Sequence, residues 1–182
     1  MLSKTQVLAR WPQQRPHVHR LNAPMRACAT WAAIEEHDKV LDMACGEGEL
    51  LYKLGENCRL TLCGMCESAD QARMAREVLD DADVVPGRME DIPWRDQTFD
   101  VVMLPSVVRG DARRVLREAF RVLRQGGQMT LAMPVVQLKG DSDTGRREMM
   151  RLMQEAGFKE VSFRASGVYG VISGWKCCER RI

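Results

Sequence analysis

The chain has 182 residues, of which 45% are hydrophobic and 29% charged, so it can form one globular domain with a substantial buried core. Its 27 basic and 25 acidic residues leave a formal charge of +2, which argues against a nucleic-acid-binding protein. It also lacks an apolar stretch of roughly 20 residues that could span a membrane.

The cysteines and the N-terminus indicate the compartment. The seven cysteines are odd in number and scattered, which disfavours a disulfide scaffold, and the first residues lack a signal-type apolar segment. We therefore expect a cytoplasmic protein without nucleic-acid or membrane partners. No oligomeric state follows from the sequence.

Residues 1–37 are predicted to form an N-terminal helical segment, with residues 38–182 as the core of the same single domain. Prolines at positions 12 and 16 interrupt the start of this segment, whereas Pro24 to Ile34 is compatible with a helix. Since no large insertion follows, this segment is the part that could form a lid. His17 and His19 have no further ligand cluster beside them, so we predict no metal site.

The most informative stretch is Val40 to Leu51, in which an apolar run ends at Asp42 and passes through small residues to Gly46 and Gly48. This order is typical of a strand, a tight loop and the start of a helix. Glycine lets bare backbone approach a ligand and tolerates positive φ, and the helix that follows offers unpaired N–H groups. Because ligands bind beyond the carboxyl ends of the strands in an open α/β sheet, the stretch predicts a nucleotide-type site.

Strands and helices alternate through the rest of the chain, which predicts an α/β fold with a mostly parallel sheet. Asp70 and Asp111 are expected to cap two helices, and Gly126 and Gly127 to end the second of them. A turn at 166–167 joins the last two strands into a hairpin, which gives the sheet an antiparallel edge. The expected strands after the first are 60–65, 84–85, 99–104, 129–133, 158–165 and 168–177, and the expected helices are 49–54, 70–79, 111–125 and 143–156.

The residues around the two glycines narrow the choice of nucleotide. A dinucleotide fingerprint, G-x-G-x-x-G, needs a third glycine for close packing of helix on strand, but Leu51 stands at that position. The chain also lacks the G-x-x-x-x-G-K-[ST] run of a phosphate-binding loop. NAD-dependent oxidoreduction is therefore strongly disfavoured.

Four sequence blocks occur in an order that is characteristic of one family. Residues 40–48, VLDMACGEG, resemble its V-L-D-x-G-C-G-x-G motif, and EDIPW at 90–94 with TFDVV at 98–102 resembles its L-P-F and F-D-x-V block. REAFRVLRQGG at 117–127 resembles R-E-x-x-R-V-L-K-P-G-G, and AGFKEV at 156–161 is similar to A-G-F-x-x-V. The chain is therefore identified as a member of the class I S-adenosylmethionine-dependent methyltransferases, in the methyltransferase type 11 group.

The resemblance implies a single Rossmann-like, doubly wound sheet of seven strands in the order 3-2-1-4-5-7-6, with strand 7 antiparallel. It implies S-adenosyl-L-methionine as the cofactor, lying across the ends of strands 1, 2 and 4, and methyl transfer to an unidentified small molecule. Asp42 would accept a charge-assisted hydrogen bond from the cofactor ammonium group. The cofactor-binding residues implied by the family pattern are Asp42, Ala44, Cys45, Gly46, Gly48, Cys66, Glu67, Ser68, Met89, Glu90 and Pro105.

Several positions depart from the family pattern. Cys66 stands where the family carries the aspartate that accepts both ribose hydroxyls, and a thiol is a poor acceptor. Glu67 could replace that aspartate if the strand end is re-aimed. Arg88 stands where a carboxylate would meet the adenine amine, and Ala44 replaces a loop glycine, which is a mild change if its φ is negative.

These departures leave open an alternative, a degenerate methyltransferase fold that serves as a cofactor-binding or protein-interaction module without turnover. No catalytic residue is assigned: Asp111 and Arg109 are base candidates by position only, and Asp111 fits better as a helix cap. Cys63 and Cys66 form a C-x-x-C pair, but an odd spacing on a strand points side chains to opposite faces. We therefore predict no redox or zinc site at this pair.

Overall fold

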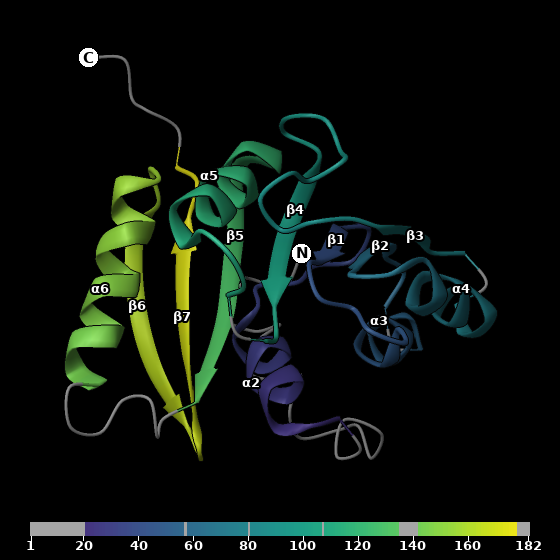
Figure 1. Cartoon of the computed structure of the whole chain (residues 1–182), viewed down its shortest axis with the longest axis horizontal. Coiled ribbons are helices and arrows are strands. Elements are labelled where there is room, and N and C mark those ends of the chain that lie inside the picture. Colours follow the sequence, from purple (N-terminus) through teal and green to yellow (C-terminus); the bar gives the residue numbers. More distant parts are fainter. Residues whose placement is uncertain (1–20, 57, 80, 107, 135–141, 178–182) are drawn as a thin grey trace.

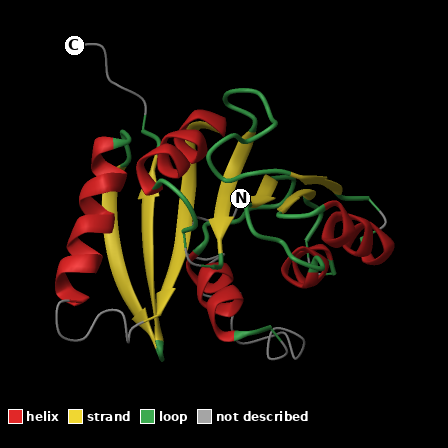
Figure 2. Cartoon of the chain, in the orientation of Figure 1, coloured by secondary structure: helices red, strands yellow, loops and turns green. Residues whose placement is uncertain are grey.

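The computed structural model describes residues 21–177 except 57, 80, 107 and 135–141, so the interpretation of His17 and His19 lies outside the described residues. Within the described part, no helix is both long enough and apolar enough to cross a membrane. Strands and helices alternate as predicted (Figure 2). The helices are α2 (Ala23–Trp31), α3 (Glu49–Gly55), α4 (Ala69–Val78), α5 (Ala112–Val122) and α6 (Ser142–Glu155). The strands are β1 (Lys39–Asp42), β2 (Thr61–Cys66), β3 (Asp83–Pro86), β4 (Phe99–Leu104), β5 (Leu123–Pro134), β6 (Lys159–Ser166) and β7 (Tyr169–Trp175).

The strands form one seven-stranded sheet in the order β3-β2-β1-β4-β5-β7-β6 (Figure 1). Strand β1 pairs in parallel with β2 and β4, whereas β7 pairs antiparallel with β5 and β6. The predicted strand order and the antiparallel strand 7 are therefore confirmed. The order reverses between β1 and β4, and a crevice at the carboxyl ends of the strands beside such a switch point is where ligands bind in these sheets.

Successive residues of the central strands face opposite sides of the sheet, and their apolar side chains are covered by helices on both sides. Leu41 of β1 belongs to an apolar cluster that includes Leu116 of α5 and Met153 of α6. Its neighbour Val40 belongs to a second cluster that includes Cys28 of α2 and residues of α3. The β1–α3 turn is thus held between two packed layers.

Helix α4 begins at a different cap from the one predicted. Ser68 is its N-cap, and the Ser68 hydroxyl accepts a hydrogen bond from the N–H of Gln71 at 3.2 Å. The predicted cap, Asp70, lies in the first turn, where its charge favours the positive end of the helix. The helix packs through Ala72 and Ala75, whereas Val78 is 47% exposed.

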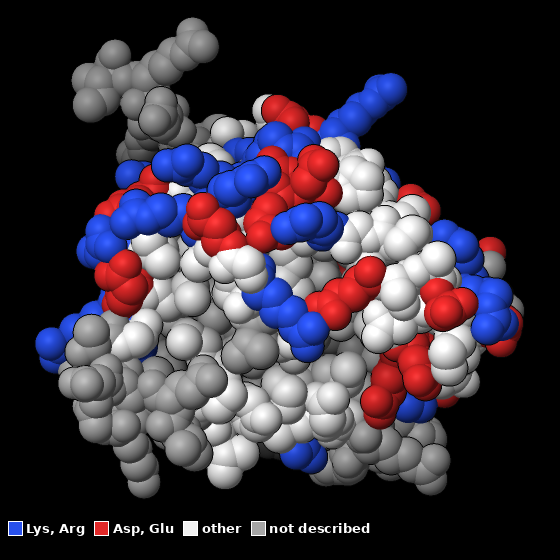
Figure 3. Space-filling view, viewed as in Figure 1, with Lys and Arg blue, Asp and Glu red and all other residues white. Residues whose placement is uncertain are grey.

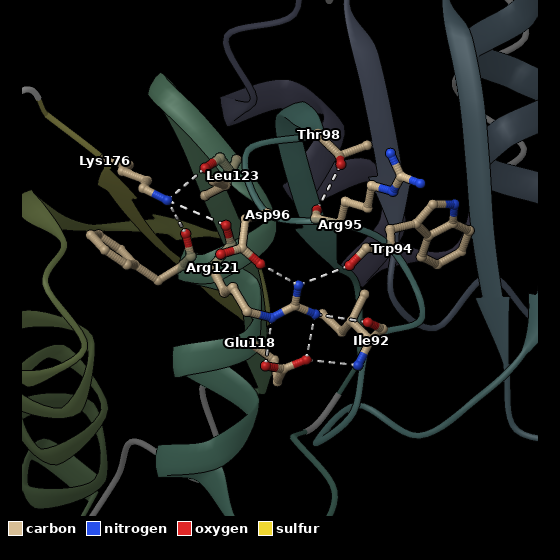
Figure 4. A network of polar contacts seen from close by, with 10 residues as sticks. Ile92, Trp94, Arg95, Asp96, Thr98, Glu118, Arg121, Leu123 and Lys176 are labelled. Atoms are coloured by element: carbon tan, nitrogen blue, oxygen red, sulfur yellow. Dashed lines mark hydrogen bonds and ion pairs between the residues drawn. The ribbon is translucent and has the colours of Figure 1, made fainter.

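Helix α5 ends at Val122, before the end predicted from Gly126 and Gly127. Both glycines lie within β5. The buried ammonium group of Lys176 donates to three carbonyl oxygens at this helix end, one of them that of Leu123 at 2.7 Å (Figure 4). Burial lowers the pKa of Lys176. A tertiary contact from the C-terminal part of the chain therefore closes the helix, which a local glycine signal could not indicate.

The surface of α5 and α6 carries arginines interspersed with carboxylates. Arg113 of α5 pairs with Glu155 of α6 at 2.6 Å, and Arg151 pairs with Glu148 at 2.5 Å. On the face shown in Figure 3, basic and acidic side chains lie side by side. This mixing agrees with the balanced overall charge.

The loop at 87–98, which joins β3 to β4 without a helix, is fastened to α5 (Figure 4). The Arg121 guanidinium donates to the carbonyl oxygens of Ile92 and Trp94 at 2.8 Å each and pairs with Glu118 at 2.8 Å. Glu118 in turn accepts a hydrogen bond from the N–H of Ile92 at 2.8 Å. Charge-assisted contacts to α5 therefore fix the position of this loop, which joins the two strands without an intervening helix.

Replacing Arg121 with methionine should lower the free energy of unfolding by about 2 kcal/mol, because a hydrogen bond to a charged group contributes about 1.5–3 kcal/mol. Methionine keeps part of the apolar stem, so the loss reports the polar contacts. Urea unfolding measures the change. The matched control is Arg117→Met on the exposed side of the same helix, which should change stability by less than about 0.5 kcal/mol. Equal effects of the two substitutions would contradict the role of the network.

Candidate functional site

Asp42 ends β1 as a fully buried carboxylate. Its Oδ1 accepts a hydrogen bond from the N–H of Ala44 at 2.9 Å, whereas its Oδ2 is buried without a partner among the described residues. Desolvation raises the pKa of Asp42 to about 7, against the smaller lowering effect of the Ala44 N–H. An unpartnered buried carboxylate oxygen is costly, so this atom fits a cationic ligand group.

Two glycines shape the loop between β1 and α3. Gly46 has a φ of +53° and Gly48 a φ of +87°, which is the left-handed region that glycine adopts without strain. A Cβ on Gly46 would meet no atom within 4 Å, so this position serves backbone conformation and leaves the backbone open. Ala44 does not have a positive φ, so its replacement of the family glycine causes no strain there, as expected.

Two cysteines join this loop to the end of β2. The Sγ atoms of Cys45 and Cys66 are 2.9 Å apart, and the Cys66 thiol donates to the carbonyl oxygen of Gly46 at 3.2 Å. A Cβ on Gly64 would lie 2.7 Å from the Cys45 sulfur and 2.9 Å from a methyl group of Leu51. The close packing of helix on strand is therefore provided by a glycine on the strand. Burial raises the pKa of both thiols, so they stay neutral.

A cavity of about 230 Å³ opens at the carboxyl ends of β2 and β3. It brings together four of the predicted residues, Cys66, Glu67, Met89 and Glu90. At its rim the Arg109 Nη1 and Glu67 Oε2 atoms form an ion pair at 2.7 Å. The lining residues are Met43, Cys66, Glu67, Gly87, Arg88, Met89, Glu90, Arg109 and Gly110.

The two altered family positions differ in their consequence. Arg88 does not fill the cavity, because its side chain is 82% exposed and pairs with Glu90 at 3.5 Å from the solvent side. Cys66 is committed to contacts with the β1–α3 loop, so it offers no carboxylate to a ligand. Glu67, one residue later, lies at the rim with a 54% exposed side chain.

The other predicted residues lie beside the cavity or away from it. Ser68 caps α4, and Pro105 is buried directly after β4, and neither lines the cavity. The remaining five form the turn next to it and are Asp42, Ala44, Cys45, Gly46 and Gly48. The structure thus joins the turn to the cavity through the Cys45–Cys66 contact.

Sequence reasoning did not place Met43, Gly87 and Gly110 in the lining, and it named Arg109 only as a base candidate by position. Gly110 is required in the cavity wall, because a Cβ on it would overlap the Glu90 Oε1 atom and because its φ is +79°. The Glu90 Oε1 atom also accepts a hydrogen bond from the N–H of Asp111, the residue after Gly110, at 3.3 Å. A glycine directly before a helix cap was the available signal for this close approach.

The other residues that the sequence suggested as reactive groups have structural roles. Cys63 and Cys66 belong to different apolar clusters, so the C-x-x-C pair does not converge, as predicted. Asp111 caps α5, since its Oδ1 accepts from the N–H groups of Arg113 and Arg114 at 2.9 and 3.4 Å. Over residues 21–177, apart from the undescribed gaps, no group of three or more His, Cys, Asp or Glu side chains could hold a metal ion.

A larger cavity, about 370 Å³, lies where α3 and α4 end and β2 begins. Leu60, Leu62, Tyr52 and Val78 are among its lining residues. This is the amino edge of the strands, whereas ligands of open α/β sheets bind at the carboxyl edge. The smaller cavity beside Asp42 is therefore the candidate site.

A family model described as "Methyltransferase domain" matches residues 41–131, which is half of the chain and runs from β1 to β5. The chain belongs to the class I S-adenosylmethionine-dependent methyltransferases. The match contains the β1–α3 turn, the cavity and the loop that Arg121 fastens.

Relatives of this chain extend the match over most of its length. It is 27% identical over 209 aligned residues to the ubiquinone/menaquinone biosynthesis C-methyltransferase UbiE of Roseobacter denitrificans, covering 87% of this chain and 81% of the relative. Its structure resembles a SAM-dependent methyltransferase of Thermotoga maritima, with a TM-score of 0.65 at 23% identity over 87% and 91% of the two chains. It also resembles a geranyl diphosphate methyltransferase in complex with SAM, with a TM-score of 0.63 at 18% identity over 79% of each chain. These structural matches show the shared fold.

Proposed function

We propose that this protein binds S-adenosylmethionine at the carboxyl edge of its sheet and transfers the methyl group to a small molecule. The observation that carries the proposal is the buried Asp42 carboxylate, whose Oδ2 has no partner among the described residues. An ammonium group, such as that of the methionine part of the cofactor, would relieve this unpaired charge. Membership of the methyltransferase family supports the same ligand.

The candidate residues divide among the parts of the cofactor. We assign the methionine end to the turn formed by Asp42, Ala44, Cys45, Gly46 and Gly48. We assign the ribose to the end of β2 with Cys66, Glu67 and Ser68, the adenine to Met89 and Glu90, and the neighbourhood of the transferred methyl group to Pro105.

Two neighbouring carboxylates replace the acidic residues that the family carries and that this chain lacks at positions 66 and 88. Glu67 is the acceptor for the ribose hydroxyls, because Cys66 is held by Cys45 and Glu67 stands free of the strand at the rim. Glu90 is the carboxylate on the adenine side, where Arg88 turns to solvent. Hydrogen bonds from backbone N–H groups lower the pKa of Glu90, so it stays ionised and can accept from an amine.

When bound, the cofactor supplies an electrophilic methyl group together with its leaving group. The protein has to hold this methyl group in line with the acceptor atom and keep water away. The fastened loop at 87–98 and the β1–α3 turn provide two fixed walls for this purpose. Rigid walls matter because small misplacements of reacting atoms lower rates strongly.

Calorimetric titration with S-adenosylmethionine and S-adenosylhomocysteine tests binding. We expect dissociation constants well below about 1 mM, and no binding at about 1 mM would overturn the proposal. Turnover is tested by incubating the protein with methyl-labelled S-adenosylmethionine and fractionated metabolite extracts. Label in a small-molecule fraction that requires active protein is the expected result.

A second candidate function is a cofactor-binding module without turnover. It is favoured by Cys66 and Arg88, which stand at positions where the family carries acidic residues. It is also favoured by the cavity volume of about 230 Å³, which is below the roughly 300–1,000 Å³ of typical small-molecule sites. Binding without labelled product in any extract would support this candidate. Labelled product would exclude it.

A further inference from the structure

The ion pair between Glu67 and Arg109 ties two segments together across the rim of the cavity. Glu67 directly follows β2, and Arg109 lies between β4 and α5, 42 residues further along the chain. Their contact is short, 2.7 Å, although the side chains are 54% and 62% exposed. Both residues line the cavity, so the pair stands at the entrance to the candidate site.

The backbone beside Arg109 is fixed while its side chain is exposed. Gly110 has a φ of +79°, and the Glu90 carboxylate packs against the place where a Cβ would stand. Glu90 also accepts from the N–H of Asp111, the cap of α5. The guanidinium of Arg109 can therefore leave Glu67 by side-chain rotation alone, without movement of the loop.

We propose that Arg109 occupies the ribose-binding carboxylate of Glu67 in the free protein and that the cofactor displaces it, an inference that rests on the proposed function. Two ribose hydroxyls need both oxygens of a carboxylate, and Arg109 holds one of them, Oε2. Arg109 thus acts as a positioning residue through Glu67. It competes with the ribose and sets both cofactor affinity and the preference for ribose over deoxyribose.

The strength of the pair limits the size of the effect. Exposed ion pairs are weak and are screened by salt, so displacement of Arg109 costs no more than about fivefold in affinity. The sign is distinctive, because salt that weakens the Glu67–Arg109 pair makes cofactor binding tighter. Asp42 is fully buried, so salt screens its interaction with the ligand much less.

Calorimetric titration with S-adenosylhomocysteine at low and high sodium chloride tests the inference. Arg109→Gln should bind it about two- to fivefold more tightly than wild type at low salt and should lose the tightening by salt. Arg109→Lys keeps the charge and should behave like wild type. With the 2′-deoxy analogue, the gain from Arg109→Gln should shrink, since one hydroxyl no longer competes.

Two further variants separate the outcomes. Glu67→Gln should weaken binding about tenfold or more, and adding Arg109→Gln to it should then have no effect, because the residues act through one contact. Arg117→Gln, on the exposed side of α5, is the control for loss of a surface charge. If Arg109→Gln binds S-adenosylhomocysteine as tightly as wild type or more weakly, the inference is overturned while the proposed function stands. Absence of binding by wild type would overturn both.

Discussion

Replacing Asp42 with asparagine should stabilise the cofactor-free protein by about 2 kcal/mol at about pH 8 and weaken S-adenosylhomocysteine binding roughly a hundredfold. Burial raises the pKa of Asp42 from 3.8 to about 7, a difference that corresponds to about 4 kcal/mol. Asparagine removes this buried charge but leaves amide N–H groups unpaired, at about 1–3 kcal/mol. The neutral amide also loses the charge-assisted bond to the ligand, about 2–3 kcal/mol.

The same pKa determines how stability depends on pH. Between pH 3.8 and about 7 the folded protein holds a proton on Asp42 that the unfolded chain has released. Protonated Asp42 therefore contributes stability that is fully present below pH 3.8 and is lost as the pH rises through about 7. Relative to wild type, Asp42→Asn should gain stability across this window.

Urea unfolding at several pH values and calorimetry with S-adenosylhomocysteine measure both effects. The control is Asp70→Asn in the first turn of α4, where the carboxylate is exposed and stability should change by less than about 1 kcal/mol. An Asp42→Asn variant that is less stable than wild type at high pH would contradict an unpaired buried charge. Undiminished ligand binding by the variant would contradict the assigned ammonium contact.

Replacing Gly64 with alanine should destabilise the protein by about 2 kcal/mol, because overpacking of a filled core costs about 1–3 kcal/mol. Gly64 pairs with Asp42 on one side and with Val84 on the other, so its backbone cannot move away. The new Cβ would push on the Cys45 sulfur, 2.7 Å away, and displace the loop that contains Gly46. We therefore expect S-adenosylhomocysteine binding to weaken about tenfold as well.

A matched glycine and a compensating variant test this explanation. A Cβ on Gly55, at the end of α3, meets one flexible methyl group of Leu62 at 3.1 Å, so Gly55→Ala should change stability by less than about 0.5 kcal/mol. Adding Cys45→Ala to Gly64→Ala should recover part of the lost stability, because it removes the clashing sulfur. Thermal unfolding compares the variants, and equal effects of the two glycine substitutions would show that the Cys45 contact is not tight.

The strands could be predicted because they depend on patterns that are local in the sequence, whereas their order in the sheet is what the family resemblance implied. Apolar runs marked the strands, and the turn from Asp42 to Gly48 is built from consecutive residues. Helix ends were less predictable. Ser68 and Asp70 are both good caps, and hydrogen bonding in the folded chain selects Ser68. The end of α5 at Val122 is closed by Lys176, which lies far along the chain.

The candidate site was predictable only as separate segments. The contact between Cys45 and Cys66 joins residues 21 positions apart, and the Glu67–Arg109 pair joins residues 42 positions apart. Such contacts depend on strand register and side-chain rotamers, which residue types do not specify. The odd spacing of Cys63 and Cys66 excluded Cys63 as a partner of Cys66, but the sequence could not identify Cys45 as its partner.

Three cysteine thiols feel the charge of the Asp42 carboxylate beside the cavity. Burial is the largest cause of the raised pKa values of Cys28, Cys45 and Cys66, and the nearby charge of Asp42 raises each of them further. Thiols are weak hydrogen-bond donors, so they leave most of this negative potential unquenched. The free protein thus favours a positively charged ligand end before any base or sugar is recognised. For the proposed cofactor, this places the first step of selection at the amino-acid tail, the end farthest from the adenine ring.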